Sequence, residues 1–149
     1  MSLTVQEAIA AKTEEALEDF LACIRRMPED KLTWRPLDQG RHALDQIREC
    51  ATAPRFYLAA LQGADYPNLK VIRETWDASE CESQARAATR DLTAAIRSIP
   101  DDELTKKIDV PKNGLITILD VLWMHLGNLT YHLGAVSFIQ TLYGDLDMD

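Results

Sequence analysis

The stretch that decides the fold is TILDVLWMHLGNLTYHLGAVSFIQTLYG, residues 117–144. It predicts one long helix that begins near Thr117, where Thr117 and Asp120 form a capping pattern, and ends at Gly144. Apolar side chains occupy nearly every face of this helix. A helix without a polar face is either central to the fold or covered on its second side by a partner.

Three polar residues of this helix, His125, Asn128 and His132, share one side of it. At 100° per residue, Asn128 lies about 60° and His132 about 20° from the direction of His125. Buried polar groups destabilise a fold unless they are hydrogen-bonded, so each of these residues predicts a partner across the interior. Gly127 and Gly134 lie on the opposite side, where they allow close approach by another helix or subunit.

Three further helices are expected earlier in the chain, where apolar residues recur at helical spacing. They are predicted over residues 5–26, 43–62 and 79–98. Ser79 and Glu82 form a capping box that would start the third of these helices. No stretch alternates as a β-strand does, so the sequence predicts no sheet.

The second helix carries the other residues of chemical interest. Its inner face would hold Cys50 and Tyr57, and Glu49 directly precedes Cys50. Pro54 has no N–H to bond the carbonyl of Cys50, four residues earlier. A kink beside Cys50 is therefore expected, and with it a place for a small molecule.

An internal repeat sets the topology. DFLACIRRMPEDKLT (residues 19–33) resembles DLTAAIRSIPDDELT (residues 91–105), 72 positions later, and each copy ends a helix and enters a long connection. Three more positions of offset align Leu44 with Leu119 and set Cys50 opposite His125. The repeat predicts one all-α domain over residues 1–149, a four-helix bundle of two equivalent helix pairs with long crossover connections.

Composition excludes several classes of function. The formal charge is −8, from 24 acidic and 16 basic residues that form no basic stripe, which argues against nucleic-acid binding. No apolar run is long enough for a membrane span, and residues 1–7 do not look like a secretory signal. The three cysteines have no CxxC spacing, as expected of free thiols in the cytoplasm.

The polar side chains allow two interpretations. Histidine is a common ligand of Zn or Ni, and Cys50 could add a thiolate, which would make a metal or acid–base site. Alternatively, His125 and His132 are hydrogen-bonded core residues and Cys50 is a small buried apolar one. The residue types favour the second interpretation, because the histidines lie about 10 Å apart along the axis. Asn128, one turn before His132, is a poor ligand for soft divalent metals.

Several short motifs, taken in order, resemble the DinB-like (DinB/YfiT) superfamily of bacterial four-helix bundles over nearly the whole chain. They are PEDKLTWRP (28–36), ALDQIREC (43–50), IPDDELT (99–105), TILDVLW (117–123), HLG (132–134) and LYG (142–144). The resemblance implies a crossed bundle, often dimeric, whose three-histidine metal site takes one ligand from the second helix and an H-x-x-x-H pair from the fourth. Members of the family include thiol-dependent transferases and isomerases and metal-dependent hydrolases.

The family's ligand positions map onto this chain with two departures. The last histidine matches His132, the one before it matches Asn128, and the ligand of the second helix falls at about Cys50. The resemblance therefore implies either a site rebuilt with His125 or a carboxylate such as Glu49, or a site that has been lost. Of these two alternatives, loss of the site or very weak binding of a divalent metal, Zn or Ni, is the expectation.

Two functions follow from these observations. The first is a metal-dependent hydrolase or thiol-dependent transferase with an altered site, and the second is a non-catalytic bundle that binds a small molecule or has a structural or regulatory role. The candidate pocket residues for either are Glu49, Cys50, Tyr57, His125, Asn128 and His132. Both functions are expected of a homodimer formed through the outer side of the fourth helix, with neither a nucleic acid nor a membrane as partner.

Overall fold

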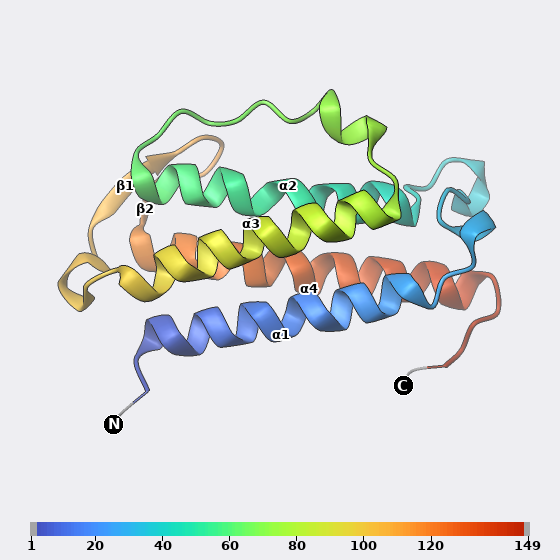
Figure 1. Cartoon of the computed structure of the whole chain (residues 1–149), viewed down its shortest axis with the longest axis horizontal. Coiled ribbons are helices and arrows are strands. Elements are labelled where there is room, and N and C mark those ends of the chain that lie inside the picture. The colour runs from blue at the N-terminus through green and yellow to red at the C-terminus, as the bar shows by residue number, and fades with distance from the viewer. Residues whose placement is uncertain (1–2, 148–149) are drawn as a thin grey trace.

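A computed structural model describes residues 3–147 (Figure 1). Its four long helices are α1 (Val5–Arg25), α2 (Ala43–Gln62), α3 (Ala78–Ser98) and α4 (Ile118–Leu142). A two-stranded hairpin, β1 (Lys107–Val110) and β2 (Gly114–Thr117), precedes α4. Short 3₁₀ helices occupy the connections, at Glu29–Lys31, Pro36–Asp38, Ile72–Thr75 and Asp101–Glu103.

The helices form the four-helix bundle that the sequence predicted. Both α1 and α2 pack on both α3 and α4, and the chain runs up, down, down and up through the four helices (Figure 1). Because α2 and α3 are parallel, the connection over residues 63–77 must return along the length of the bundle, as it does above α2 in Figure 1. The connections from α1 to α2 and from α3 to α4 are long, as expected, and each joins two antiparallel helices at one end of the bundle (Figure 1). None of the described helices is long and apolar enough to cross a membrane.

The repeat is visible in the backbone hydrogen bonds. Leu44 N–H donates to the Leu32 carbonyl at 2.9 Å, and Leu119 N–H donates to the Leu104 carbonyl at 3.0 Å. The two donors are 75 positions apart and the two acceptors 72, as the aligned sequences predict. The first turn of α2 is therefore hydrogen-bonded to the segment that follows α1, and the first turn of α4 to the segment that follows α3.

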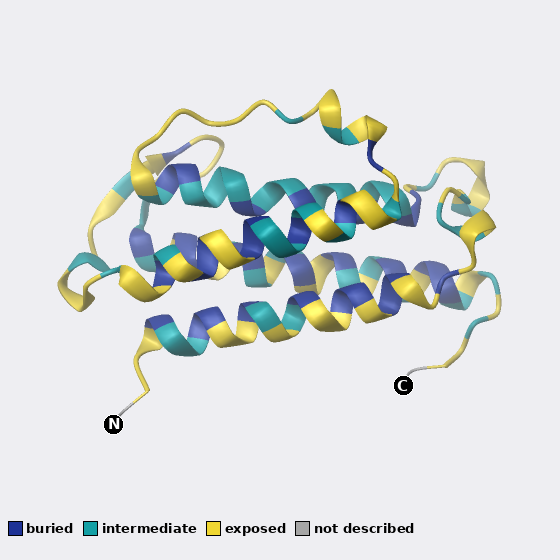
Figure 2. Ribbon diagram, in the orientation of Figure 1, coloured by how far each residue is buried: buried dark blue, intermediate teal, exposed yellow. Residues whose placement is uncertain are grey.

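The core lies between the four helices, and α4 supplies much of it (Figure 2). Leu122, Leu129 and Val136 are fully buried, and each lies two turns after the one before it. On its other side, Tyr131 is 69% and Phe138 64% exposed, which confirms that the helix is apolar on both sides. Burial of a large aliphatic side chain stabilises a fold by about 1.5–3 kcal/mol, so the inner stripe of α4 is a major source of stability.

The hairpin corrects the prediction that the chain has no sheet. β1 and β2 pair antiparallel, with Lys107 opposite Thr117 and Val110 opposite Gly114. Val110 is fully buried and packs with Ala60 of α2 and Val121 of α4. The hairpin is thus held by long-range packing, which a four-residue alternation in the sequence does not reveal.

One smaller prediction changes, and the predicted end of α2 is confirmed. The cap of α3 is Asp77, whose side chain accepts a hydrogen bond from Glu80 N–H at 2.8 Å, so Ser79 lies within the helix and the expected box with Glu82 is not the start. The α2 helix continues through the buried Pro54 to Gln62. The capping box of α4 is confirmed, because the Thr117 and Asp120 side chains each accept from the other's backbone N–H.

Candidate functional site between α2 and α4

The centre of the candidate site is the buried side chain of His132. One ring nitrogen, Nδ1, is hydrogen-bonded to Gln46 Oε1, and the other, Nε2, lies 3.1 Å from Glu49 Oε2. An amide oxygen and a carboxylate both accept hydrogen bonds, so both ring nitrogens of His132 are placed to donate. The ring of His132 is thus fixed between two residues of α2.

Glu49 is held as a carboxylate by the groups around it. The hydrogen bond from His132 is the main cause that lowers the pKa of Glu49 to about 2, with Arg41 as a further cause and partial burial opposing it. Arg41 Nη2 lies 3.0 Å from Glu49 Oε1, on the side away from His132. A carboxylate with so low a pKa is a weak proton acceptor at neutral pH, so it acts as a fixed charge.

His125 has a different environment from His132. It is fully buried, its Nε2 is 3.0 Å from Thr89 Oγ1 of α3, and its Nδ1 has no hydrogen-bond partner among the described residues. Burial, with a smaller contribution from the charge of His132, lowers the pKa of His125 to about 3. The ring is therefore neutral at physiological pH and belongs to the core.

Cys50 also belongs to the core. Its side chain is fully buried, and burial together with the neighbouring Glu49 carboxylate raises the pKa of the thiol well above its ordinary value. The thiolate is the form that binds a metal or attacks an electrophile. Cys50 consequently offers neither a ready ligand nor a ready nucleophile.

Three of the predicted residues line one cavity of about 370 Å³, here named the hairpin pocket. They are Glu49 and Tyr57 of α2 and Asn128 of α4, and the turn of the hairpin, residues 111–113, supplies another wall. Within the described part of the chain, the buried Oδ1 of Asn128 accepts no hydrogen bond. An unsatisfied buried acceptor is costly, so the Asn128 amide is positioned to receive a donor from a bound molecule.

These residues do not fit the three-histidine metal site that the resemblance implies. Nowhere in residues 3–147 do three His, Cys, Asp or Glu side chains lie together as a metal site requires. The His132 nitrogen nearest the pocket residues is bonded to Glu49, and Asn128 offers only a neutral amide oxygen. The His132 nitrogen and the Glu49 oxygen that could bind a metal are thus engaged with each other.

Sequence reasoning named both His132 and Glu49 as candidates but missed the other residues that bond the site. Gln46 and Arg41 hold the two ends of the His132–Glu49 pair, and Thr89 bonds His125. The signal for Gln46 was available, because it lies three residues before Glu49 and therefore on the same side of the helix.

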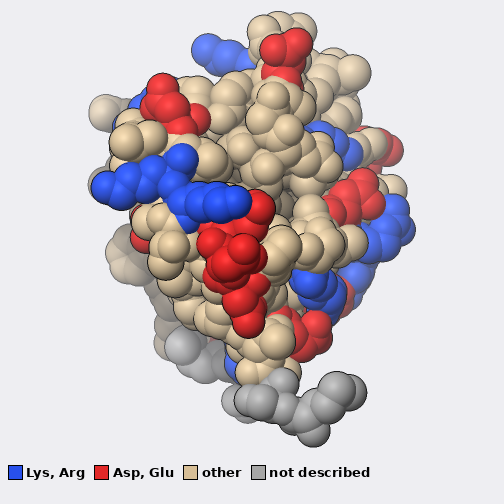
Figure 3. Space-filling model, turned by 90° about the vertical axis from the view of Figure 1, so that its left-hand side faces the viewer, with Lys and Arg blue, Asp and Glu red and all other residues tan. Residues whose placement is uncertain are grey.

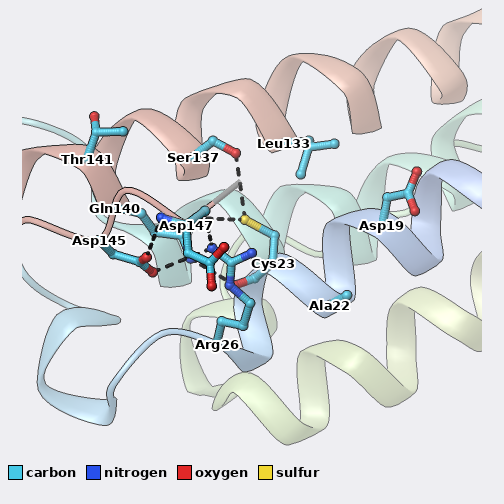
Figure 4. Close-up of a pocket in the computed structure, with 10 residues that line it drawn as sticks. All are labelled: Asp19, Ala22, Cys23, Arg26, Leu133, Ser137, Gln140, Thr141, Asp145 and Asp147. Carbon is cyan, nitrogen blue, oxygen red and sulfur yellow. Dashed lines mark hydrogen bonds and ion pairs between the residues drawn. The ribbon is translucent and has the colours of Figure 1, made fainter. Parts of the chain in front are cut away.

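Another cavity, of about 400 Å³, lies between α1 and α4 near the end of the chain (Figure 4). Cys23 lines it and donates to Gln140 Oε1 at 3.0 Å, while Gln140 Nε2 donates to the Cys23 carbonyl at 3.2 Å. Arg26 approaches Asp145 at 3.6 Å on the same wall. Burial raises the pKa of the Cys23 thiol, which keeps it protonated. The hydrogen bonds between Cys23 and Gln140 and the ion pair between Arg26 and Asp145 hold α1 against α4 and the segment that follows it.

Charges of both signs are dispersed over the end of the bundle that carries the hairpin (Figure 3). Acidic and basic side chains alternate there around uncharged surface, and neither sign covers that face.

The comparisons with known proteins agree with the fold. Residues 12–136 match the profile of the DinB superfamily, and no curated protein matches the chain. The structure resembles that of YfiT from Bacillus subtilis, described as a probable metal-dependent hydrolase with an unusual four-helix bundle topology: the identity is 14%, the TM-score 0.77, and 97% of this chain and 90% of that one are covered. It also resembles a DinB-like protein, YjoA, from Bacillus subtilis, at 13% identity and a TM-score of 0.69, covering 95% of this chain and 96% of that one.

Proposed function

We propose that this chain, which belongs to the DinB superfamily, binds a small molecule in the hairpin pocket and does so without a three-histidine metal centre. The observation that carries the proposal is the bond between His132 Nε2 and Glu49 Oε2. It occupies the one histidine that the chain shares with the family's ligand positions. The unpartnered Asn128 oxygen in the same cavity supports a bound molecule as its missing partner.

The chemistry of the pocket favours binding over proton transfer. Glu49 is too weak a base for general base catalysis near neutral pH, and the thiol of Cys50 is buried and protonated. Burial raises the pKa of the Tyr57 hydroxyl as well, which keeps it a neutral hydrogen-bonding group. The pocket therefore presents a fixed charge and neutral donors and acceptors, which suit recognition of a polar ligand.

A second candidate is a metal-dependent hydrolase. The similarity to YfiT favours it, and so does the free Asn128 oxygen near Glu49, since Asn128, Glu49 and His132 together would offer two oxygens and one nitrogen. It requires the bond between His132 and Glu49 to open. Because His132 and Glu49 already bond each other, this candidate has the weaker structural support.

Metal content distinguishes the two candidates. We expect tag-free protein to contain substoichiometric metal, and Zn²⁺, Ni²⁺ or Mn²⁺ to leave its Tm unchanged, in elemental analysis and thermal unfolding. His132→Ala tests the site, and His42→Asn is the matched control, because His42 caps α2 and asparagine is also a good cap. One metal per chain, with a rise in Tm that His132→Ala abolishes and His42→Asn retains, would establish the hydrolase candidate instead.

Ligand binding can be tested by a thermal-shift screen of small polar compounds. A compound that raises Tm in the wild type should lose its effect in Asn128→Leu, which removes the free acceptor at similar volume. Thr130→Leu, on the exposed side of the same helix, should keep the effect. If both variants respond equally, the compound binds elsewhere and the pocket is not its site.

We also propose that the chain forms a homodimer through the outer side of α4. Trp123, Tyr131 and Phe138 are 48%, 69% and 64% exposed there, and Cβ atoms added at Gly127 and Gly134 would meet nothing within 4 Å. An exposed apolar stripe with small residues suits a two-fold partner that presents the same surface. Light scattering at micromolar concentration should give a dimer mass for the wild type and Leu3→Glu, and a monomer for Phe138→Glu; a monomeric wild type would contradict the proposal.

We place the protein in the cytoplasm, because Cys23, Cys50 and Cys81 are all unpaired and buried. Free thiols suit a reducing compartment. Subcellular fractionation of the native host tests this location, and recovery with secreted proteins would contradict it.

A further inference from the structure

A second cavity adjoins the hairpin pocket beside α2. This crossover pocket, of about 270 Å³, lies under the connection between α2 and α3. The two cavities share the wall formed by Thr52, Ala53 and Phe56, and Arg73 lines both. Together they form one groove, here named the α2 groove, which is covered by the crossover and by the turn of the hairpin.

Three cations line the α2 groove. Lys70 and Arg73 come from the crossover and Lys112 from the hairpin turn. Among the described residues that line it, Glu49 is the one acid, and its charge is already held by His132 and Arg41. Neither Lys70 nor Lys112 forms an ion pair within the described part of the chain. The groove is thus locally positive on a protein whose formal charge is −8.

Two details indicate that this positive charge is positioned for a ligand. Arg73 Nε is buried and donates no hydrogen bond to the described residues, although Glu74 Oε1 lies 3.5 Å away, and Glu74 is bound to Arg48 at 3.1 Å. Lys112 adopts a left-handed backbone with a φ of 71°, an unfavourable conformation for a residue with a side chain. Strained residues of this kind cluster at binding sites.

We propose that the α2 groove selects an anionic small molecule, one that carries a carboxylate or phosphate group. The anionic group binds between Arg73 and the two lysines, and the rest of the molecule extends to Tyr57 and Asn128 in the hairpin pocket. A guanidinium with an unused N–H is a strong donor to either kind of anion. This inference rests on the proposed function, because it names the class of ligand that the hairpin pocket binds.

The test is a titration of the full-length ¹⁵N-labelled protein with inorganic phosphate and, separately, acetate, at constant ionic strength set by chloride. We expect saturable changes in the amide signals of residues 52, 53, 55, 56, 68–73, 112 and 113, and the stronger of the two probes identifies the preferred anionic group. Lys112→Gln should weaken binding about tenfold, the loss expected for one hydrogen bond to a charged group. Lys107→Gln, in the same hairpin but outside both pockets, should bind as the wild type does.

The outcomes separate this inference from the proposed function. Absence of saturation with both anions, or equal weakening by Lys107→Gln and Lys112→Gln, overturns the anionic ligand. If an uncharged compound then binds at Tyr57 and Asn128, the proposed function still stands. Saturable anion binding at residues 68–73 in a protein whose hairpin pocket binds no compound from the screen would support the anion site and overturn the proposed function.

Discussion

The bond between His132 and Glu49 makes the stability of the protein depend on pH in a predictable direction. The pKa of Glu49 is lowered from 4.5 to about 2 in the folded protein. A carboxylate whose pKa is depressed on folding stabilises the fold above its unfolded pKa and loses that contribution as the pH falls toward the folded value. Glu49→Gln removes this contribution at every pH, so its effect on stability should shrink on acidification.

The size of the effect follows from the pKa difference. One pKa unit corresponds to about 1.4 kcal/mol, which gives an upper value of roughly 3 kcal/mol for Glu49. The Glu49 side chain is 32% and Arg41 48% exposed, so solvent screening reduces this to about 1–2 kcal/mol. Linkage then removes roughly half or more of that difference between pH 7 and pH 3.

Urea unfolding followed by circular dichroism at pH 7, 5, 4 and 3 measures the difference between wild type and variant. The difference is needed because His125 also destabilises the acid form: its folded pKa of about 3 lies below the 6.5 of the unfolded chain, so its contribution is lost as the pH falls below 6.5. This loss is common to both proteins and cancels. Glu29→Gln, at an exposed position, serves as the control and should show a small difference at every pH.

A difference between wild type and Glu49→Gln that stays constant from pH 7 to pH 3 would refute the reasoning. It would mean that the carboxylate does not depend on His132 and Arg41 for its charge. The observation that carries the proposed function would then fail as well.

Three further predictions concern the rest of the fold, and chemical or thermal unfolding checks each. Lys112→Gly should stabilise the protein by about 1 kcal/mol, because glycine accepts the left-handed backbone without strain; a lower Tm would show that the Lys112 side chain contributes more than its strain. Asp77→Ala should destabilise by about 1 kcal/mol and Ser79→Ala by much less, and the reverse order would restore Ser79 as the cap of α3. Phe20→Ala should destabilise by about 3–5 kcal/mol, since Phe20 is fully buried, and a loss below 1 kcal/mol would contradict its place in the core.

The fold could be predicted because its main determinants are local or repeated. Helix periodicity gave the four helices to within two residues at each end, and the repeat gave the connections that Leu44 and Leu119 now close. The hairpin could not be predicted in the same way. Its strands have four residues each and pair only with each other, and such a hairpin is marginal unless it packs on something else. The packing of Val110 on α2 and α4 is a contact between distant segments.

The site was predicted less completely, because its residues depend on helix rotation. Glu49 and Cys50 are neighbours in sequence, but neighbours on a helix point about 100° apart. Alignment of the family's ligand at Cys50 could not show that Cys50 faces the core while Glu49 faces His132. His132 itself was predicted correctly as a residue of the inner side, because the whole helix around it sets its direction.

The repeat also bears on how many sites one chain contains. At the offset of 75 positions, Glu49 corresponds to Met124 and Ala53 to Asn128, and all four residues line the hairpin pocket. The pocket therefore lies where the two equivalent helix pairs meet. A duplicated fold forms this junction between α2 and α4 once, so the chain has one such pocket there. Each corresponding pair now joins one polar and one apolar residue. A ligand in this pocket would meet both the Glu49 charge and the Asn128 amide, so the sequence differences between the two halves would favour one orientation over the other.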